Sequence, residues 1–180
     1  MWSIIFINRF PFIKRRMFNA VCFISCLALI IAAICFEKYG LEFPCPLCLI
    51  QRYLVGLLGI VFFIAAVVNF KHVPSFPKLM ALIILLVSLA GAASSIRHIW
   101  IQMLPDDQVP ACTAPLDALV KEDGIFKTFQ TIYMEGSGDC HDSSWRFLWL
   151  TMPMWVLIWF AGFAITGFIV NWFDVKEDSV

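Results

Sequence analysis

The hydrophobic residues of this chain are gathered into four long runs, and shorter segments between them hold most of the charges. The runs cover residues 17–36, 49–70, 79–96 and 149–171. A helix that crosses a membrane needs roughly 20 apolar residues, within a range of about 17–25. Each run therefore predicts one membrane-spanning helix.

We expect residues 1–180 to form a single all-α membrane domain, a four-helix transmembrane bundle. Small residues at 91–95 would let the third helix approach its neighbours closely. Pro153 is expected to start or kink the fourth helix. A secretory signal peptide has a shorter apolar region that ends at a small-residue cleavage site. The first run is longer and is followed by CFEKYG, so a retained helix is the better interpretation.

The basic residues predict the orientation of the bundle. They precede the first helix and occupy the loop between the second and third, at Arg9, Lys14, Arg15, Arg16, Lys71 and Lys78. Segments rich in lysine and arginine stay in the cytoplasm. Both termini are therefore expected inside, and the loops at 37–48 and 97–148 on the other side of the membrane.

Composition supports a membrane protein and excludes one large class of function. Hydrophobic residues make up 61% of the 180 residues, and the mean hydropathy is +0.85. A soluble domain is typically about 45–50% apolar. The net charge is zero, so the chain lacks the basic surface that nucleic-acid binding requires.

The seven cysteines fall into two groups. Three lie in the first run and are interpreted as small buried hydrophobes, at Cys22, Cys26 and Cys35. Four lie in the loops expected outside, at Cys45, Cys48, Cys112 and Cys140. Four cysteines in an oxidising compartment suit two disulfides but allow three pairings. Cys45 and Cys48 are close enough in sequence to pair locally, which would leave Cys112 to pair with Cys140.

The stretch PCPLCLIQR, residues 44–52, places a Cys-X-X-Cys pair at the expected start of the second helix. Pro46 suits the first helical position, which would make Cys45 the N-cap and put Cys48 in the first turn. The helix dipole and Arg52, one turn further on, would then both stabilise Cys48 as a thiolate. Alternatively, Arg52 only extends its guanidinium to the membrane surface.

Two other interpretations of the cysteines compete with redox chemistry. A metal carrier uses Cys-X-X-Cys to bind soft ions, but an adjacent arginine adds nothing to such a site, so no metal ligand is expected. A non-catalytic four-span scaffold with a disulfide-stapled outer loop would explain Cys112 and Cys140. It does not explain a Cys45–Cys48 pair beside Arg52.

Several motifs in order along the chain resemble the DsbB family of bacterial disulfide bond formation proteins. They are PCPLCLIQR, RHIWIQMLP, Cys112, GSGDC ending at Cys140, and WRFLWLTMPMW. The resemblance implies a thiol oxidase of the bacterial inner membrane. Such a protein reoxidises the periplasmic dithiol protein DsbA and passes two electrons to a membrane quinone, either ubiquinone or menaquinone.

The resemblance also implies roles for individual residues. Cys45 and Cys48 would be the pair that faces the quinone, and Cys112 and Cys140 the pair that faces DsbA. Cys112 would form the mixed disulfide with the partner. Arg52 and His98 would lie near the quinone together with Cys48. The alternative for His98 is an interfacial polar residue that caps the third helix.

An amphipathic stretch occupies residues 116–133 of the long loop. Its apolar residues recur at roughly helical spacing, at Leu116, Leu119, Val120, Phe126, Phe129 and Tyr133. Such a segment can lie in the membrane interface with its apolar face down, where it would hold Cys112 and Cys140 near the bilayer. An ordinary packed loop helix is the alternative.

Overall fold

The four expected helices are present in the computed structural model, which describes residues 15–39, 45–68, 75–111, 138–141 and 146–173 and isolated positions between 120 and 132. They are α2 (Arg15–Lys38), α3 (Pro46–Val67), α4 (Phe76–Gln102) and α6 (Met152–Phe173). Each is long and apolar enough to cross a membrane. The prediction of an all-α, four-helix transmembrane bundle is confirmed.

Short elements complete the described part of the chain. They are two 3-10 helices, η1 (Asp106–Gln108) and η2 (Gly138–Cys140), and an antiparallel hairpin of β1 (Arg146–Phe147) and β2 (Leu150–Thr151). The hairpin precedes α6 directly, so α6 begins after the expected boundary at 149, and Pro153 starts this helix rather than kinking it.

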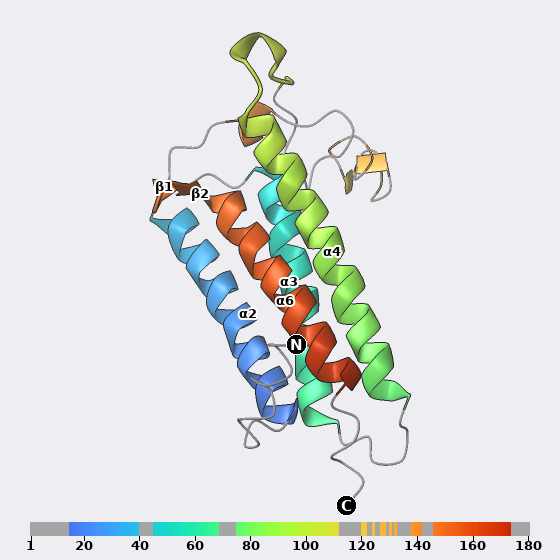
Figure 1. Cartoon of the computed structure of the whole chain (residues 1–180). Helices are drawn as coiled ribbons and strands as arrows, with labels where there is room; N and C mark the ends of the chain where they lie inside the picture. Colours follow the sequence, from blue (N-terminus) through green and yellow to red (C-terminus); the bar gives the residue numbers. More distant parts are fainter. Residues whose placement is uncertain are drawn as a thin grey trace, which may run out of the picture.

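The helices run alternately up and down, so the bundle has two distinct ends (Figure 1). We call the end where α2 begins and α6 finishes the terminal end. The opposite end, which carries the first turn of α3 and the hairpin, is called the cysteine end. Three helix pairs pack closely: α2 on α3, α3 on α4 and α4 on α6. The contact between α2 and α6 is much smaller than any of these.

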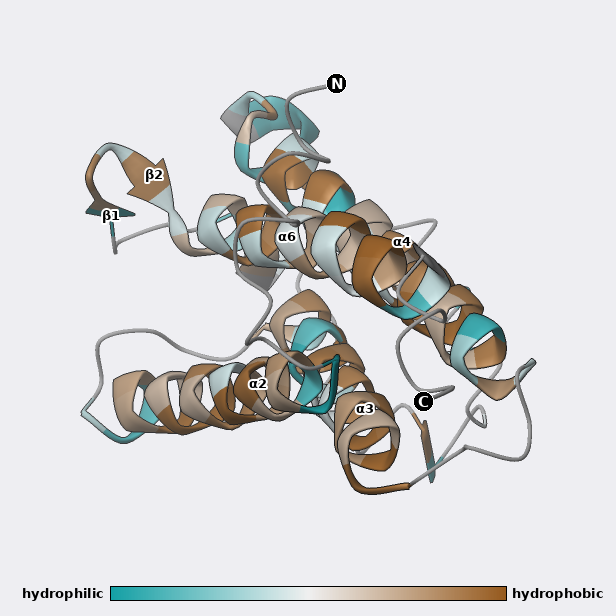
Figure 2. Cartoon of the chain, turned by 60° about the horizontal axis from the view of Figure 1, so that its bottom comes forward, coloured by the Kyte–Doolittle hydropathy of each residue, from teal (hydrophilic) through white to brown (hydrophobic). Residues whose placement is uncertain are grey.

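The side chains that face outward are largely apolar, as a lipid-embedded bundle requires. Figure 2 shows hydrophobic residues around all four helices rather than on their inner faces alone. Exposed examples come from every helix, at Ile24, Ile31, Ile60, Leu86 and Ile165. The buried core between the helices is built around Leu58, Phe62, Ile84 and Phe160.

The predicted close approach of the third helix occurs at Gly91. This buried glycine of α4 lies under the ring of Phe160 on α6, and a Cβ at this position would collide with that ring. Close contact between transmembrane helices depends on such small residues because lipid provides no hydrophobic force to press helices together.

We expect Gly91→Ala to weaken the packing of α4 on α6. Forcing an extra carbon into a filled core typically costs about 1–3 kcal/mol. Thermal unfolding in detergent micelles measures the loss. Gly162→Ala on α6 is the control, since nothing lies within 4 Å of the Cβ that it would add. Equal stability changes in the two variants would contradict this account of the contact.

A pair of buried amides joins α2 to α6 near the terminal end. Asn19 donates from Nδ2 to Oδ1 of Asn171 over 3.0 Å, and Asn171 donates back over the same distance. Asn171 also donates to the carbonyl oxygen of Gly167. Hydrogen bonds of this kind between transmembrane helices contribute roughly 0.6–2 kcal/mol. The contact therefore stabilises a helix pair that otherwise touches little.

The hairpin contains two strained residues. Leu148 and Trp149 form its two-residue turn with φ values of 51° and 69°. Non-glycine residues in this left-handed region carry a cost of order 1–3 kcal/mol each. The sequence prediction missed the turn because Trp149 and Leu150 read as the start of the fourth apolar run.

Candidate functional site

Cys45 and Cys48 lie together at the first turn of α3. Cys45 is the N-cap and Pro46 the first helical residue, as the sequence predicted. The Cys48 backbone N–H donates to the Cys45 sulfur over 3.4 Å, and the two sulfurs are 3.2 Å apart. Cys45 is buried, and Cys48 is partly exposed. The helix terminus thus holds one thiol inward and the other toward a neighbouring pocket.

His98 lies against both thiols. Its Nε2 is 3.7 Å from the Cys45 sulfur, and its Nδ1 is 3.9 Å from the Cys48 sulfur. The alternative that His98 caps the third helix is wrong, because α4 continues to Gln102 and is capped by Met103. The imidazole is instead buried inside the bundle, where it can donate a proton to or accept one from a neighbouring sulfur.

Cys140 reaches the same cluster from the long loop. The ligand atoms of Cys45, His98 and Cys140 all lie within 4.8 Å of one another, and all three residues are buried. The short helix η2 packs on α3 and α4, and His141 donates from Nε2 to the Leu104 carbonyl oxygen over 3.0 Å. These contacts hold Cys140 against the first turn of α3.

Cys112 lies outside the described residues, so its expected role stays a prediction. The neighbouring residue Ala111 is described, and its carbonyl oxygen accepts a hydrogen bond of 3.2 Å from the N–H of Gly138. The chain just before Cys112 is thereby joined to the segment that ends at Cys140.

An apolar shell encloses the buried thiols. Leu47, Ile101 and Ile132 are fully buried and pack around Cys45 and Cys140. Ile132 belongs to the stretch at 116–133, but most of the residues behind the prediction of an interfacial helix lie outside the described residues. Of the six apolar residues named for that prediction, Val120 alone is described, and it is half-buried.

Hydrogen bonding within the cluster shifts the pKa of Cys45 and the pKa of Cys140 in opposite directions. The hydrogen bond toward Cys140, and then the one toward Cys48, raises the pKa of Cys45, and burial adds to the effect. Accepting from Cys45 lowers the pKa of Cys140, with a further contribution from His98, although burial opposes both. In the reduced state Cys140 is therefore the better nucleophile and Cys45 the group that stays protonated.

We expect this difference to appear as a pH dependence. With all thiols reduced, Cys140 should remain reactive at pH values below the usual cysteine pKa of about 8.5, because only the thiolate reacts. Cys45 should need a higher pH. Mass spectrometry after alkylation at a series of pH values reports each cysteine separately. Both residues are buried, so a difference in reagent access does not explain a difference between them. Alkylation of Cys45 at a lower pH than Cys140 would contradict the assignment.

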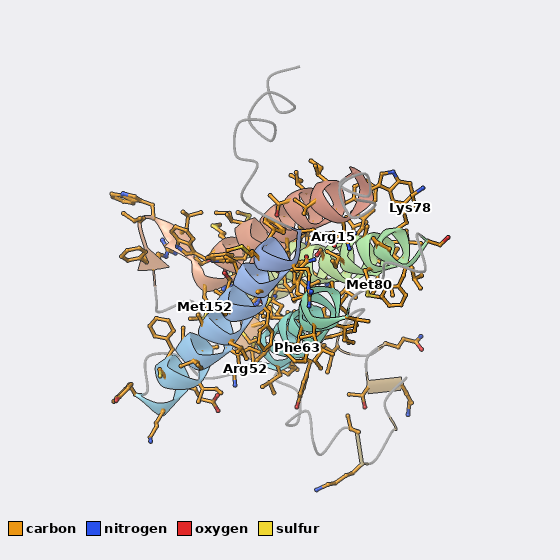
Figure 3. All side chains as sticks on the ribbon, turned by 90° about the horizontal axis from the view of Figure 1, so that it is seen from below. Arg15, Arg52, Phe63, Lys78, Met80 and Met152 are labelled. Atoms are coloured by element: carbon orange, nitrogen blue, oxygen red, sulfur yellow. The ribbon has the colours of Figure 1, made fainter. Side chains whose placement is uncertain are left out.

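A pocket of about 190 Å³ opens beside Cys48. It is lined by α2, α3 and the first two turns of α6, and Figure 3 labels two of its residues, Arg52 and Met152. Most of the lining is apolar or aromatic, with contributions from Leu29, Ile30, Ala33, Phe36, Val55, Trp155 and Trp159. The polar lining residues are Glu37, Cys48, Gln51 and Arg52.

Arg52 is held in this pocket by α2. Its Nη1 donates to the Glu37 carboxylate over 2.8 Å, and its Nη2 lies 3.4 Å from the Ala33 carbonyl oxygen. The Nε of Arg52 and the Nε2 of Gln51 are buried there without a hydrogen-bond partner. Gln51 and Arg52 both line the pocket with Cys48, so their side chains bring N–H donors to its wall.

The structure divides the residues that the sequence grouped around a cofactor. Cys48 and Arg52 line the pocket. His98 contacts the thiols but is not one of the described residues that line the pocket. The sequence prediction missed Glu37, Gln51 and Trp155. Glu37 had one available signal, since it is an acid at the end of an apolar run on the same side of the membrane as Arg52.

Comparison with known proteins gives one consistent result. Residues 15–170 match the family model described as disulfide bond formation protein DsbB. A protein of Xylella fastidiosa named disulfide bond formation protein B is 39% identical over 158 residues, which cover 86% of this chain and 90% of that protein. One of the same name from Xanthomonas axonopodis pv. citri is 35% identical over 159 residues, covering 88% and 90%.

Proposed function

The chain belongs to the DsbB family of disulfide bond formation proteins, and from that premise we propose the reaction it carries out. A member of this family is a disulfide-forming oxidoreductase, and four transmembrane helices make this one a multi-pass protein of the bacterial inner membrane. We propose that it reoxidises a DsbA-like periplasmic dithiol protein and passes two electrons through two cysteine pairs to a membrane quinone.

The position of Cys45 carries this proposal. Cys45 contacts Cys140 of the long loop on one side and Cys48, which lines the pocket, on the other. A thiol in contact with two others can exchange disulfides with each, because the reaction requires only that one sulfur reach another. A non-catalytic scaffold with a stapled loop, the alternative, would have no use for this arrangement.

The exchange steps balance in bonds and electrons. The partner's thiolate attacks Cys112 of a Cys112–Cys140 disulfide and releases Cys140, which attacks Cys45 of a Cys45–Cys48 disulfide and releases Cys48. The partner's second thiol then displaces Cys112, and Cys112 displaces Cys45 from Cys140. One disulfide has formed in the partner, and Cys45 and Cys48 hold two electrons.

The pocket residues suit a quinone. Cavities of about 150 Å³ hold a benzene ring, so a pocket of about 190 Å³ admits a substituted ring but leaves a long isoprenoid tail outside. Gln51 and Arg52 line the pocket, and their amide and guanidinium N–H groups are the donors that would bind the ring oxygens. A bound quinone would supply an acceptor for the two electrons and two protons released as Cys45 and Cys48 re-form their disulfide.

The assay that tests this function uses the purified protein in lipid vesicles. Reduced DsbA-like protein is added without oxygen, and the absorbance of ubiquinone, or in a separate trial menaquinone, is followed. We expect one quinone reduced per partner disulfide formed, no reaction in Cys48→Ser, and normal reaction in Cys35→Ser, whose thiol is exposed on α2. Partner oxidation without quinone reduction would refute the proposal.

We further propose that both termini face the cytoplasm and that the cysteine end faces the periplasm. The basic residues before α2 and between α3 and α4 support this orientation. It places Cys45 and Cys140 on the side where the soluble partner lies.

The orientation predicts which cysteines an impermeant reagent can label. In intact cells with a permeabilised outer membrane, variants that retain only Cys48 or only Cys112 should react with a membrane-impermeant maleimide. A cysteine introduced at the terminal end by Ser75→Cys should react only after the inner membrane is broken. Labelling of position 75 alone in intact cells would show the opposite orientation.

A further inference from the structure

The hairpin at the cysteine end displays three large apolar side chains. Trp149 at its tip is 97% exposed, Leu148 beside it 64% and Phe147 on β1 54%. Figure 1 shows the hairpin next to the start of α6, at the cysteine end of the bundle. None of the steps proposed for the redox reaction uses these residues.

The turn conformation is unusual for these residue types. Two-residue hairpin turns with positive φ at both positions strongly favour Asn-Gly or similar pairs. Leucine and tryptophan occupy them here. A glycine at position 149 would form the same turn with less strain. The turn thus accepts strain while it holds the Trp149 side chain away from the bundle.

The position of the hairpin relative to α6 indicates the environment of the Trp149 side chain. The hairpin ends where the membrane-spanning helix α6 begins, so it lies at the level where hydrocarbon gives way to water. Tryptophan is enriched at this level because its ring is apolar and its N–H is polar. Arg146, exposed at the base of the hairpin, adds a guanidinium suited to lipid phosphate.

We propose that the hairpin 146–151 is a membrane anchor, with Trp149 and Leu148 inserted in the outer-leaflet interface and Arg146 bound to lipid phosphate. The hairpin leads directly into α6, which carries exposed apolar side chains such as Ile158 and Ile165. A soluble partner protein, the other candidate for an exposed apolar tip, would leave these side chains in water between encounters.

The anchor is connected to the pocket through Trp155. The indole Nε1 of Trp155 donates to the Phe147 carbonyl oxygen over 3.1 Å, and the two rings lie 6.1 Å apart between centroids. Trp155 and Met152 line the pocket. This part of the inference rests on the proposed function: the anchor would hold the pocket wall at the depth from which a lipid-dissolved quinone enters.

Fluorescence quenching tests the anchor independently of catalysis. The protein is placed in vesicles of phosphatidylethanolamine and phosphatidylglycerol that carry bromine at successive acyl positions. The emission of Trp149 is obtained by subtracting the spectrum of Trp149→Phe from that of the unmodified protein. We expect strongest quenching by bromine near the headgroups and little by aqueous iodide. Quenching by iodide instead, or protection only by reduced DsbA-like protein, would overturn the proposal.

Kinetics test the connection to the pocket. In vesicles, Trp149→Gly should raise the apparent KM for a long-chain quinone several-fold and leave kcat unchanged. In detergent, with a short-chain quinone, it should behave as the unmodified protein. Trp100→Ala removes another exposed tryptophan, on α4 away from the pocket, and should change neither constant. Thermal unfolding of Trp149→Gly should show no loss of stability, since glycine relieves the turn.

The two readouts separate the two proposals. If no quinone is reduced under any condition, the proposed function fails while quenching still decides the anchor. If quinone is reduced but Trp149→Gly leaves the KM for long-chain quinone unchanged in vesicles, the connection between anchor and pocket is refuted and the function stands.

Discussion

In a Cys140→Ser variant, quinone reduction by the reduced partner is expected to fall to background. When oxidised partner is added instead, the free Cys112 thiolate attacks its disulfide, and a covalent adduct through Cys112 is expected to accumulate. Without Cys140 no thiol of the long loop can release the partner by re-forming the Cys112–Cys140 disulfide. The same change removes the sulfur that contacts Cys45, so electrons cannot pass onward. Non-reducing gel electrophoresis and peptide mapping detect the adduct.

Two further variants test whether the adduct depends on the loss of Cys140. Cys45→Ser also blocks quinone reduction, but it leaves Cys140 free to reverse the attack, so less adduct should accumulate. Cys35→Ser should behave as the unmodified protein. An adduct of Cys140→Ser that maps to Cys45 rather than Cys112 would reverse the proposed order of exchange.

Replacing Arg52 is expected to have the second large effect. Arg52→Ala removes a donor from the pocket and leaves the Glu37 carboxylate without its guanidinium partner. A hydrogen bond to a charged group contributes about 1.5–3 kcal/mol, so the apparent KM for quinone should rise roughly tenfold to a hundredfold, at about 1.4 kcal/mol for each factor of ten. Exchange between Cys112 and the partner should be almost unchanged.

Two further substitutions separate the roles of Arg52. Arg52→Lys keeps a charge but loses the planar guanidinium that donates to Glu37 and Ala33 at the same time. We therefore expect a smaller rise in the KM for quinone than in Arg52→Ala. Glu37→Gln keeps the guanidinium in the pocket and removes only the ion pair. If Arg52→Ala leaves the KM for quinone unchanged, Arg52 is an interfacial anchor and not part of the quinone site.

The parts of the fold that depend on local sequence were predictable. Long apolar runs identify spanning helices because unpaired backbone groups are not tolerated in lipid. Pro46 and the Cys-X-X-Cys spacing placed Cys45 at the N-cap, where the structure has it. The end of α4 was set too early, because hydropathy falls at Arg97 while the helix continues into the interface and carries His98 with it.

The parts of the site that depend on helix rotation were not predictable. A helix that is apolar on all sides has no polar face to show which residues turn inward, so the pairing of Glu37 with Arg52 could not be read from the pattern. The approach of Cys140 to Cys45 depends on how a long loop folds back onto two helix ends. The contribution of Trp155 to the pocket also depends on that three-dimensional packing.

The buried amide pair at the terminal end has a consequence for the pocket at the other end. Asn19 and Glu37 are 18 residues apart, about five turns of helix, so they lie along one stripe of α2. If α2 turned about its long axis, two amides would lose their partners inside the membrane. The amides therefore act as a rotational stop. They lie about five turns from Glu37, yet they keep its side chain directed toward Arg52.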